Sequence, residues 1–167
     1  MARILIVGCG CRGQHLAKGL CAEGHQVRGT TRDPLNYPKI EAAGAEAVFA
    51  DPNSLMTLTP ALADVTVVVW LLGSASGDKA LVADLHGPRL ERLLESVVDT
   101  PVRGFVYEAS GSVPGDVLES GAGLAETAAR TWMIPVEVVC TPAETDCEAL
   151  LESVHRAVRR LLASTLL

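Results

Sequence analysis

Three glycines near the amino terminus have the spacing of a phosphate-binding turn. A short apolar run leads into the pattern Gly-x-Gly-x-x-Gly, and helix-forming residues follow it. Gly8 permits the tight turn, Gly10 lets a pyrophosphate approach the backbone, and Gly13 lets the helix pack close to the strand. The free N–H groups at the start of the helix can then bind the anion. The sequence therefore predicts a dinucleotide-binding site, which includes the intervening Cys11 and Arg12.

The residues at the end of the second apolar run, Gln26–Thr31, indicate which dinucleotide binds. The chain has Thr31 and Arg32 where an acidic residue would bind both ribose hydroxyls of NAD(H). An arginine offers a planar, permanently charged fork for a 2′-phosphate, the Thr31 hydroxyl adds a donor, and Arg12 could approach the same group. We therefore favour NADP(H) over NAD(H). The alternative is that Arg32 is a solvated loop residue and that Asp33 binds the ribose.

The elements that must position these residues follow from the hydrophobic pattern. Short runs rich in Val, Ile and Leu alternate with longer amphipathic stretches, as in a parallel sheet covered on both faces. Strands are expected near Arg3–Val7, Gln26–Thr31, Ala47–Ala50, Thr66–Leu72, Gly104–Glu108 and Val136–Cys140. Helices are expected near Arg12–Ala22, Tyr37–Ala43, Ser54–Leu62, Lys79–Val98, Leu118–Trp132 and Thr145–Ala163.

This order predicts an α/β fold, a Rossmann-like doubly wound three-layer sandwich with a mainly parallel sheet of about six strands. We expect a single domain over residues 1–167. Gly24 is expected to end the first helix in a left-handed conformation, while Ser54 and Thr145 are expected to cap theirs. Apolar positions on the 79–98 helix and on the last helix favour a homodimer.

Composition narrows the partners and the compartment. The chain has 167 residues, of which 49% are hydrophobic and 20% charged, enough to bury a sizeable core. A net charge of −6 argues against nucleic acid as the main partner. The longest apolar run, Val65–Gly73, is too short to cross a bilayer, and the sequence starts without leader features, so we expect a cytoplasmic protein. The five cysteines form no Cys-x-x-Cys pair, and no histidine has an acid at metal-binding spacing, so no metal site is predicted.

Four segments resemble the short-chain dehydrogenase/reductase superfamily, in the extended or atypical branches that include epimerase/dehydratase-like and NmrA-like proteins. They are the glycine turn with its helix (8–20), the second predicted strand with the residues that follow it (24–34), the predicted helix before the fifth strand (84–95), and the fifth strand with its serine turn (103–111). The resemblance implies that Asp51 contacts the adenine edge and that Leu72, Gly73 and Ser74 lie along the middle of the cofactor. Asp51 could equally cap a turn before Pro52.

The same resemblance supplies only part of a catalytic set. In the family's enzymes a Ser or Thr after the fifth strand polarises a carbonyl, and a Tyr with a Lys four residues later exchanges the proton. Ser110 stands at the serine position, but Pro114 replaces the tyrosine, and no later Tyr-x-x-x-Lys occurs. Glu108, at the end of the fifth predicted strand, could act as general acid or base if burial raised its pKa. The alternative is that Glu108 is a solvated residue at the strand end. Tyr107 is interpreted as a packed strand aromatic.

Two thiols lie in the glycine turn. The start of a helix can lower the pKa of a thiol, so oxidation of Cys9 or Cys11 could obstruct cofactor binding. The alternative is that both are small residues chosen to fit a crowded turn.

The sequence leaves three functions open. The first is a small NADPH-dependent oxidoreductase that lacks the Tyr-Lys pair and reduces a flavin, a quinone or another small-molecule acceptor. The second is a non-catalytic NADP(H)-binding sensor or regulatory module, whose affinity for a protein partner depends on the cofactor. The third is a sugar-nucleotide epimerase or dehydratase, against which the missing Tyr-Lys pair counts.

Overall fold

The predicted β-branched and apolar runs form the strands of one parallel sheet. The computed structural model describes residues 1–142 and 145–164. Its strands are β1 (Arg3–Val7), β2 (Gln26–Thr31), β3 (Glu46–Phe49), β4 (Val67–Trp70), β5 (Gly104–Glu108) and β6 (Val136–Val139). All pairings are parallel, in the order β3-β2-β1-β4-β5-β6. The order reverses between β1 and β4, so the ligand crevice expected of a doubly wound sheet lies at the carboxyl ends of these strands.

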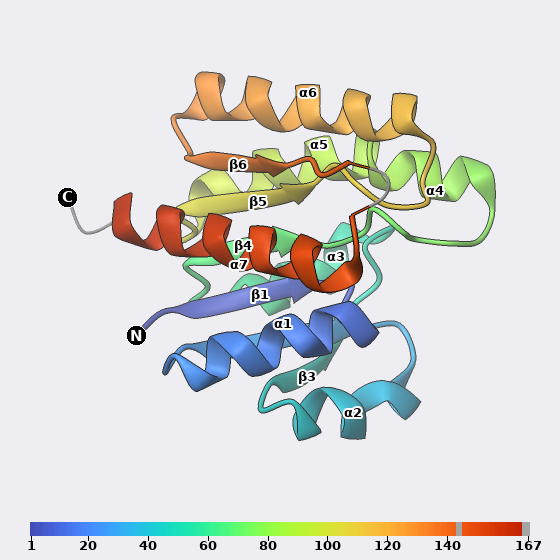
Figure 1. The fold of residues 1–167 in the computed structure, drawn as a ribbon. Coiled ribbons are helices and arrows are strands. Elements are labelled where there is room, and N and C mark those ends of the chain that lie inside the picture. Colours follow the sequence, from blue (N-terminus) through green and yellow to red (C-terminus); the bar gives the residue numbers. More distant parts are fainter. Residues whose placement is uncertain (143–144, 165–167) are drawn as a thin grey trace.

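Helices cover both faces of the sheet (Figure 1). One face carries α1 (Cys11–Ala22), α2 (Tyr37–Ala42) and α7 (Cys147–Ser164), and the other carries α3 (Leu55–Leu58), α4 (Lys79–Leu85), α5 (Pro88–Ser96) and α6 (Gly115–Trp132). Short 3-10 turns are η1 (Pro34–Asn36), η2 (Thr59–Leu62) and η3 (Val97–Asp99). Along β1, Ile4 and Ile6 enter one core while Leu5 and Val7 enter the other. The predicted doubly wound three-layer fold is confirmed.

The predicted long helix over 79–98 is wrong, because two helices occupy this stretch. Helix α4 ends at Leu85, Gly87 has the non-helical angles φ −130 and ψ −114, and Pro88 starts α5. A proline fits the first turn of a helix but disfavours a helical residue before it. The Gly-Pro pair therefore ends one helix and starts the next. As a result His86 caps α4 and turns into the core, where only 1% of it is exposed.

Helix ends follow the sequence in part. Gly24 has φ +88 after α1, as predicted. Ser54 stands at the N-cap of α3, but its side chain makes no capping hydrogen bond. At α7 the predicted cap Thr145 is wrong, because Asp146 is the residue whose carboxylate accepts the Ala149 N–H, at 2.7 Å.

Most of the apolar positions that favoured a homodimer pack inside the chain, namely Leu90, Leu93 and Leu94 of α5 and Leu150, Val154 and Val158 of α7. Packing against the sheet explains these six residues. Leu81 and Val98, in the same 79–98 stretch, stay 50% and 45% exposed, so the homodimer remains a prediction. Within residues 1–142 and 145–164, no helix combines the length and the apolar character needed to cross a membrane.

Candidate functional site

The glycine turn has the geometry that its spacing predicts. Gly8 has φ +90, and a Cβ there would lie 2.7 Å from the Leu71 carbonyl oxygen. A Cβ on Gly13 would lie 3.0 Å from the Gly8 carbonyl oxygen, so α1 packs tightly against its strand. At Gly10, by contrast, a Cβ would meet nothing within 4 Å. No side chain caps the start of α1, so its first N–H groups are available to an anion above Gly10.

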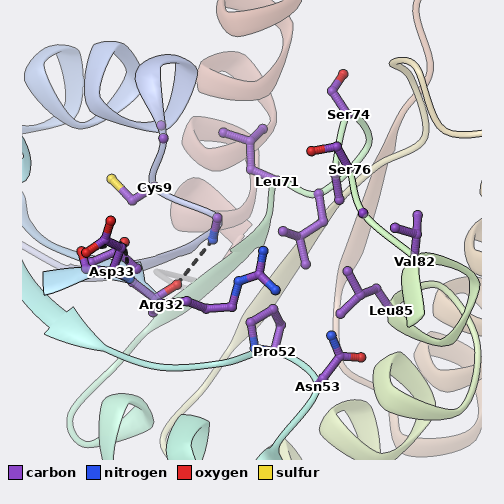
Figure 2. A pocket seen from close by; sticks show the side chains of 18 of the residues that line it. Cys9, Arg32, Asp33, Pro52, Asn53, Leu71, Ser74, Ser76, Val82 and Leu85 are labelled. Carbon is purple, nitrogen blue, oxygen red and sulfur yellow. Dashed lines mark hydrogen bonds between the residues drawn. The ribbon is translucent and has the colours of Figure 1, made fainter. Parts of the chain in front are cut away.

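A cavity of about 790 Å³ opens over this turn, which is within the usual range for small-molecule sites. The turns after β1, β2, β3 and β4 line it together with α4 (Figure 2). Most of the predicted cofactor-binding residues line it, namely Gly8, Gly10, Cys11, Arg12, Gly13, Thr31, Arg32, Leu72 and Ser74. The predicted Asp51 and Gly73, and the catalytic candidates Glu108 and Ser110, do not.

Arg32 is the cation that the structure makes available at the end of β2. Its exposed side chain extends into the cavity toward Pro52 (Figure 2), and it forms no hydrogen bond or ion pair within the described residues. The Asp33 carboxylate instead caps η1 by accepting the Leu35 N–H at 3.0 Å. The Thr31 hydroxyl is also engaged, because it accepts the Asp33 N–H at 3.1 Å.

Asn53, and not the predicted Asp51, lines the cavity after β3. The Asp51 carboxylate accepts the Asn53 N–H at 2.9 Å, and the Asp51 N–H donates to the Thr57 hydroxyl at 2.8 Å, so Asp51 caps a turn. Asn53 lines the cavity (Figure 2), and its buried Oδ1 has no hydrogen-bond partner among the described residues. Sequence reasoning missed Asn53, because an Asn after Asp-Pro signals a turn and nothing more.

Arg12 and Glu108 are paired with each other. The two guanidinium nitrogens Nη1 and Nη2 donate to Oε2 and Oε1, both at 3.0 Å, and no part of Glu108 is exposed. Burial raises the pKa of Glu108, and the opposing influences are Arg12 and the N–H of Gly73. Glu108 is thus not a solvated strand end, and Arg12 is not directed at a 2′-phosphate.

The hydroxyl groups of Ser110 and Tyr107 also have hydrogen-bond partners within the chain. The Ser110 hydroxyl accepts the Thr141 N–H at 2.6 Å, which connects the turns after β5 and β6. The Tyr107 hydroxyl lies 2.6 Å from Nδ1 of His86, whose Nε2 lies 3.1 Å from the Leu72 carbonyl oxygen. Because a carbonyl only accepts, Nε2 carries the proton and the tyrosine donates to Nδ1. Burial raises the pKa of Tyr107 and lowers the pKa of His86, so both stay neutral in this buried pair.

The thiols of the glycine turn differ in exposure. Cys9 is buried, and burial raises the pKa of its thiol to about 12. Its sulfur fills the space above Gly29, where a Cβ would lie 2.6 Å from it, so packing explains Cys9. Cys11 is exposed on the cavity wall. The described residues contain no cluster of His, Cys, Asp or Glu that could hold a metal ion.

Comparison with known proteins supports a nucleotide site. A model of the NAD(P)H-binding family matches residues 8–133. No curated protein matches the chain. Solved structures do match. A short-chain dehydrogenase/reductase superfamily protein from Agrobacterium tumefaciens with bound NAD is 21% identical, with TM-score 0.68 over 81% of this chain and 48% of its own.

Two sugar-nucleotide epimerases have the same fold. The UDP-glucuronic acid 4-epimerase from Bacillus cereus in complex with NAD is 20% identical, with TM-score 0.67 over 81% of this chain and 55% of its own. The UDP-glucose 4-epimerase from Thermotoga maritima is 17% identical, with TM-score 0.68 over 81% of this chain and 54% of its own. The chain thus spans about half the length of these structures. Since the family model covers most of the sequence, this chain belongs to the NAD(P)H-binding family and has the Rossmann fold of short-chain dehydrogenase/reductase proteins.

Proposed function

We propose that this protein binds NADP(H) as a sensor or regulatory module and does not itself transfer hydride. One observation carries the proposal: every candidate proton-transfer group is hydrogen-bonded within the chain and lies outside the cavity. Glu108 is held by Arg12, Ser110 by Thr141, and Tyr107 by His86. A general acid or base must reach the reacting group directly or through one water.

The preference for NADP(H) over NAD(H) rests on the end of β2. NAD(H) recognition uses a carboxylate that accepts from both ribose hydroxyls, and one oxygen of the Asp33 carboxylate, Oδ1, is engaged by the Leu35 N–H. Arg32 lies in the cavity with its guanidinium unpaired among the described residues, and such a fork suits a phosphate. The 2′-phosphate would therefore neutralise the positive charge of Arg32, which has no ion-pair partner among the described residues.

Other groups of the cavity suit the rest of an adenosine phosphate. The open space above Gly10 and the uncapped start of α1 favour a pyrophosphate there. Asn53 lines the cavity, and rotation of its amide, whose buried Oδ1 has no partner among the described residues, would present an acceptor to the amino group of adenine. A cofactor bound this way changes the charge of the cavity rim. A protein partner that contacts the rim would then bind with an affinity that depends on the cofactor, and the reverse dependence follows by linkage.

Two further expectations concern the cellular location of the protein and the epimerase alternative. The cysteines of the chain are all free thiols, which supports the proposed cytoplasmic, reducing location. The epimerase or dehydratase alternative would need the Tyr-Lys pair that the sequence lacks.

Calorimetric titration with NADPH and NADH, using the wild type and Arg32→Ala, tests the proposal. Loss of a charge-assisted phosphate contact worth about 1.5–3 kcal/mol should weaken NADPH binding roughly 10–150-fold. NADH binding should not change. Arg32→Lys should recover only part of the loss, because an ammonium lacks the planar fork. Arg130→Ala, on the exposed surface of α6, is the matched control. Equal binding of NADPH by the wild type and Arg32→Ala would contradict the proposed preference.

Hydride transfer is tested separately, by following NADPH absorbance with flavin and quinone acceptors. We expect no oxidation above that of the cofactor alone. Turnover that depends on acceptor and protein would contradict the sensor proposal and favour the small NADPH-dependent oxidoreductase.

A further inference from the structure

A doubly wound sheet offers neighbouring places for the two nucleotides of a dinucleotide. The ligand crosses the crevice with one nucleotide over each βαβαβ half. In this chain the first half consists of β1, β2 and β3, and the second consists of β4, β5 and β6. The adenosine of NADP(H) would lie over the first half, near Arg32. The nicotinamide nucleotide would need open space over the second half.

The turns after β4 and β5 are bonded to each other at that place. The Gly73 carbonyl oxygen accepts the Val113 N–H at 3.0 Å, and the Ser74 hydroxyl oxygen accepts the Ser112 N–H at 3.2 Å. A Cβ on Gly73 would clash with the Glu108 carboxylate. The two turns are therefore in direct contact, with no space for a ring between them.

Arg12, in the glycine turn, adds an ion pair with Glu108 at the end of β5. We call this pair, together with the bonded turns after β4 and β5, the Arg12–Glu108 closure. The Arg12 guanidinium forms two parallel hydrogen bonds of 3.0 Å to Glu108, and only 24% of the Arg12 side chain is exposed. Moving Arg12 aside would leave the Glu108 carboxylate buried without its counter-charge, which is strongly unfavourable. The ion pair therefore resists opening by a ligand.

The residues that line the cavity are consistent with the Arg12–Glu108 closure. They come from the turns after β1 to β4 and from α4, as Figure 2 shows for most of them. Among the described residues, none from β5, β6 or the turns after them lines the cavity. The open space thus lies over the first half of the sheet, the turn after β4 and α4, and the described residues of β5 and β6 do not border it.

We infer that the site recognises the adenosine and phosphate half of NADP(H) and leaves the nicotinamide ring outside the Arg12–Glu108 closure. The inference rests on the proposed function and specifies what the sensor measures. Oxidation changes only the nicotinamide ring, so NADP⁺ and NADPH would bind alike. The protein would respond to the total amount of 2′-phosphorylated cofactor and not to its redox state.

Calorimetric titration of the wild type with 2′-phosphoadenosine 5′-diphosphoribose, NADP⁺ and NADPH tests the inference without any variant that could misfold. The first ligand keeps the 2′-phosphate and both phosphates of the pyrophosphate and lacks only the nicotinamide ring. We expect the three dissociation constants to agree within about tenfold, which corresponds to about 1.4 kcal/mol. A dinucleotide that binds more than tenfold tighter than 2′-phosphoadenosine 5′-diphosphoribose would overturn the inference, because the excess affinity would come from the nicotinamide ring.

The emission of the reduced nicotinamide ring gives a second readout. A ring left in water should keep the spectrum of free NADPH when the protein is added at saturating concentration. A blue shift with increased intensity would show a ring enclosed by protein and would also overturn the inference. Failure of all three ligands to bind would instead contradict the proposed function itself, so the two failures are distinguishable.

Discussion

The two halves of the sheet present opposite surfaces at the same carboxyl edge. Over β1, β2 and β3 several polar groups have no side-chain partner among the described residues: the first N–H groups of α1, the Arg32 guanidinium and Oδ1 of Asn53. Over β4, β5 and β6 the side chains of Glu108, Ser110 and Tyr107 are all hydrogen-bonded. The first half therefore offers polar groups to a ligand, whereas the polar side chains of the second half have their partners within the chain.

Two glycines illustrate this difference. A Cβ at Gly10 would meet nothing within 4 Å, whereas a Cβ at Gly73 would overlap the Ser110 carbonyl oxygen and the Glu108 carboxylate. The first glycine keeps space open for a ligand, and the second lets two turns of the chain touch. The same residue type thus serves binding in one half and packing in the other.

The largest effect is expected from alanine at these two positions. Gly73→Ala should lower the free energy of unfolding by about 3 kcal/mol, the upper end of typical overpacking costs. Gly10→Ala should change it by less than about 0.5 kcal/mol but weaken NADPH binding, because the new methyl group occupies the phosphate space. Urea unfolding and calorimetric titration measure the two effects. Equal stability losses in both variants would remove the contrast between the two halves.

The next effect concerns the Arg12–Glu108 pair. Removing one partner of a buried pair costs roughly 3–5 kcal/mol, and partial exposure of Arg12 reduces this, so we expect Glu108→Gln and Arg12→Met each to lose about 2–3 kcal/mol. The double variant Arg12→Met/Glu108→Gln should lose less than the sum of the two single losses, since no unpaired charge remains. Urea unfolding of all three variants provides the double-mutant cycle. Additive losses would show that the two residues act independently.

The open half was more predictable from sequence than the closed half. The glycine turn, the strands and Arg32 depend on local spacing, so their positions follow from residues near one another in the chain. The Arg12–Glu108 pair joins residues 96 positions apart, and each side chain alone has several plausible partners. Local patterns therefore suggested a phosphate contact for Arg12 and left Glu108 open.

His86 shows the same limit. Its partners Tyr107 and Leu72 come from two other strand ends, and the prediction of one helix over 79–98 placed His86 inside that helix. The Gly87-Pro88 pair contained the signal for a helix end. Once the helix is divided there, His86 becomes a capping residue next to the core, and its burial follows.

The smallest effect is expected from an exposed counterpart of the buried pair. Glu23, which follows α1, accepts a hydrogen bond from Arg159 of α7 at 3.0 Å, and His155 lies 3.1 Å away. The Arg159 hydrogen bond is the main cause that lowers the pKa of Glu23 from 4.5 to about 2. Because the folded pKa lies below the ordinary value, the pair's contribution is complete above pH 4.5 and is lost as the pH falls toward 2.

Solvent screens this pair, so Glu23→Gln should lower the free energy of unfolding at pH 7 by about 0.5–1 kcal/mol. The difference from the wild type should shrink as the pH falls from 4.5 toward 3, and 0.5 M salt should reduce it further. Urea unfolding at several pH values measures this, with Glu126→Gln on the exposed face of α6 as control. Salt should affect the Glu108→Gln loss much less, because the buried pair is shielded from mobile ions. A salt dependence as large for Glu108→Gln as for Glu23→Gln would mean that the second half of the crevice is open to solvent after all.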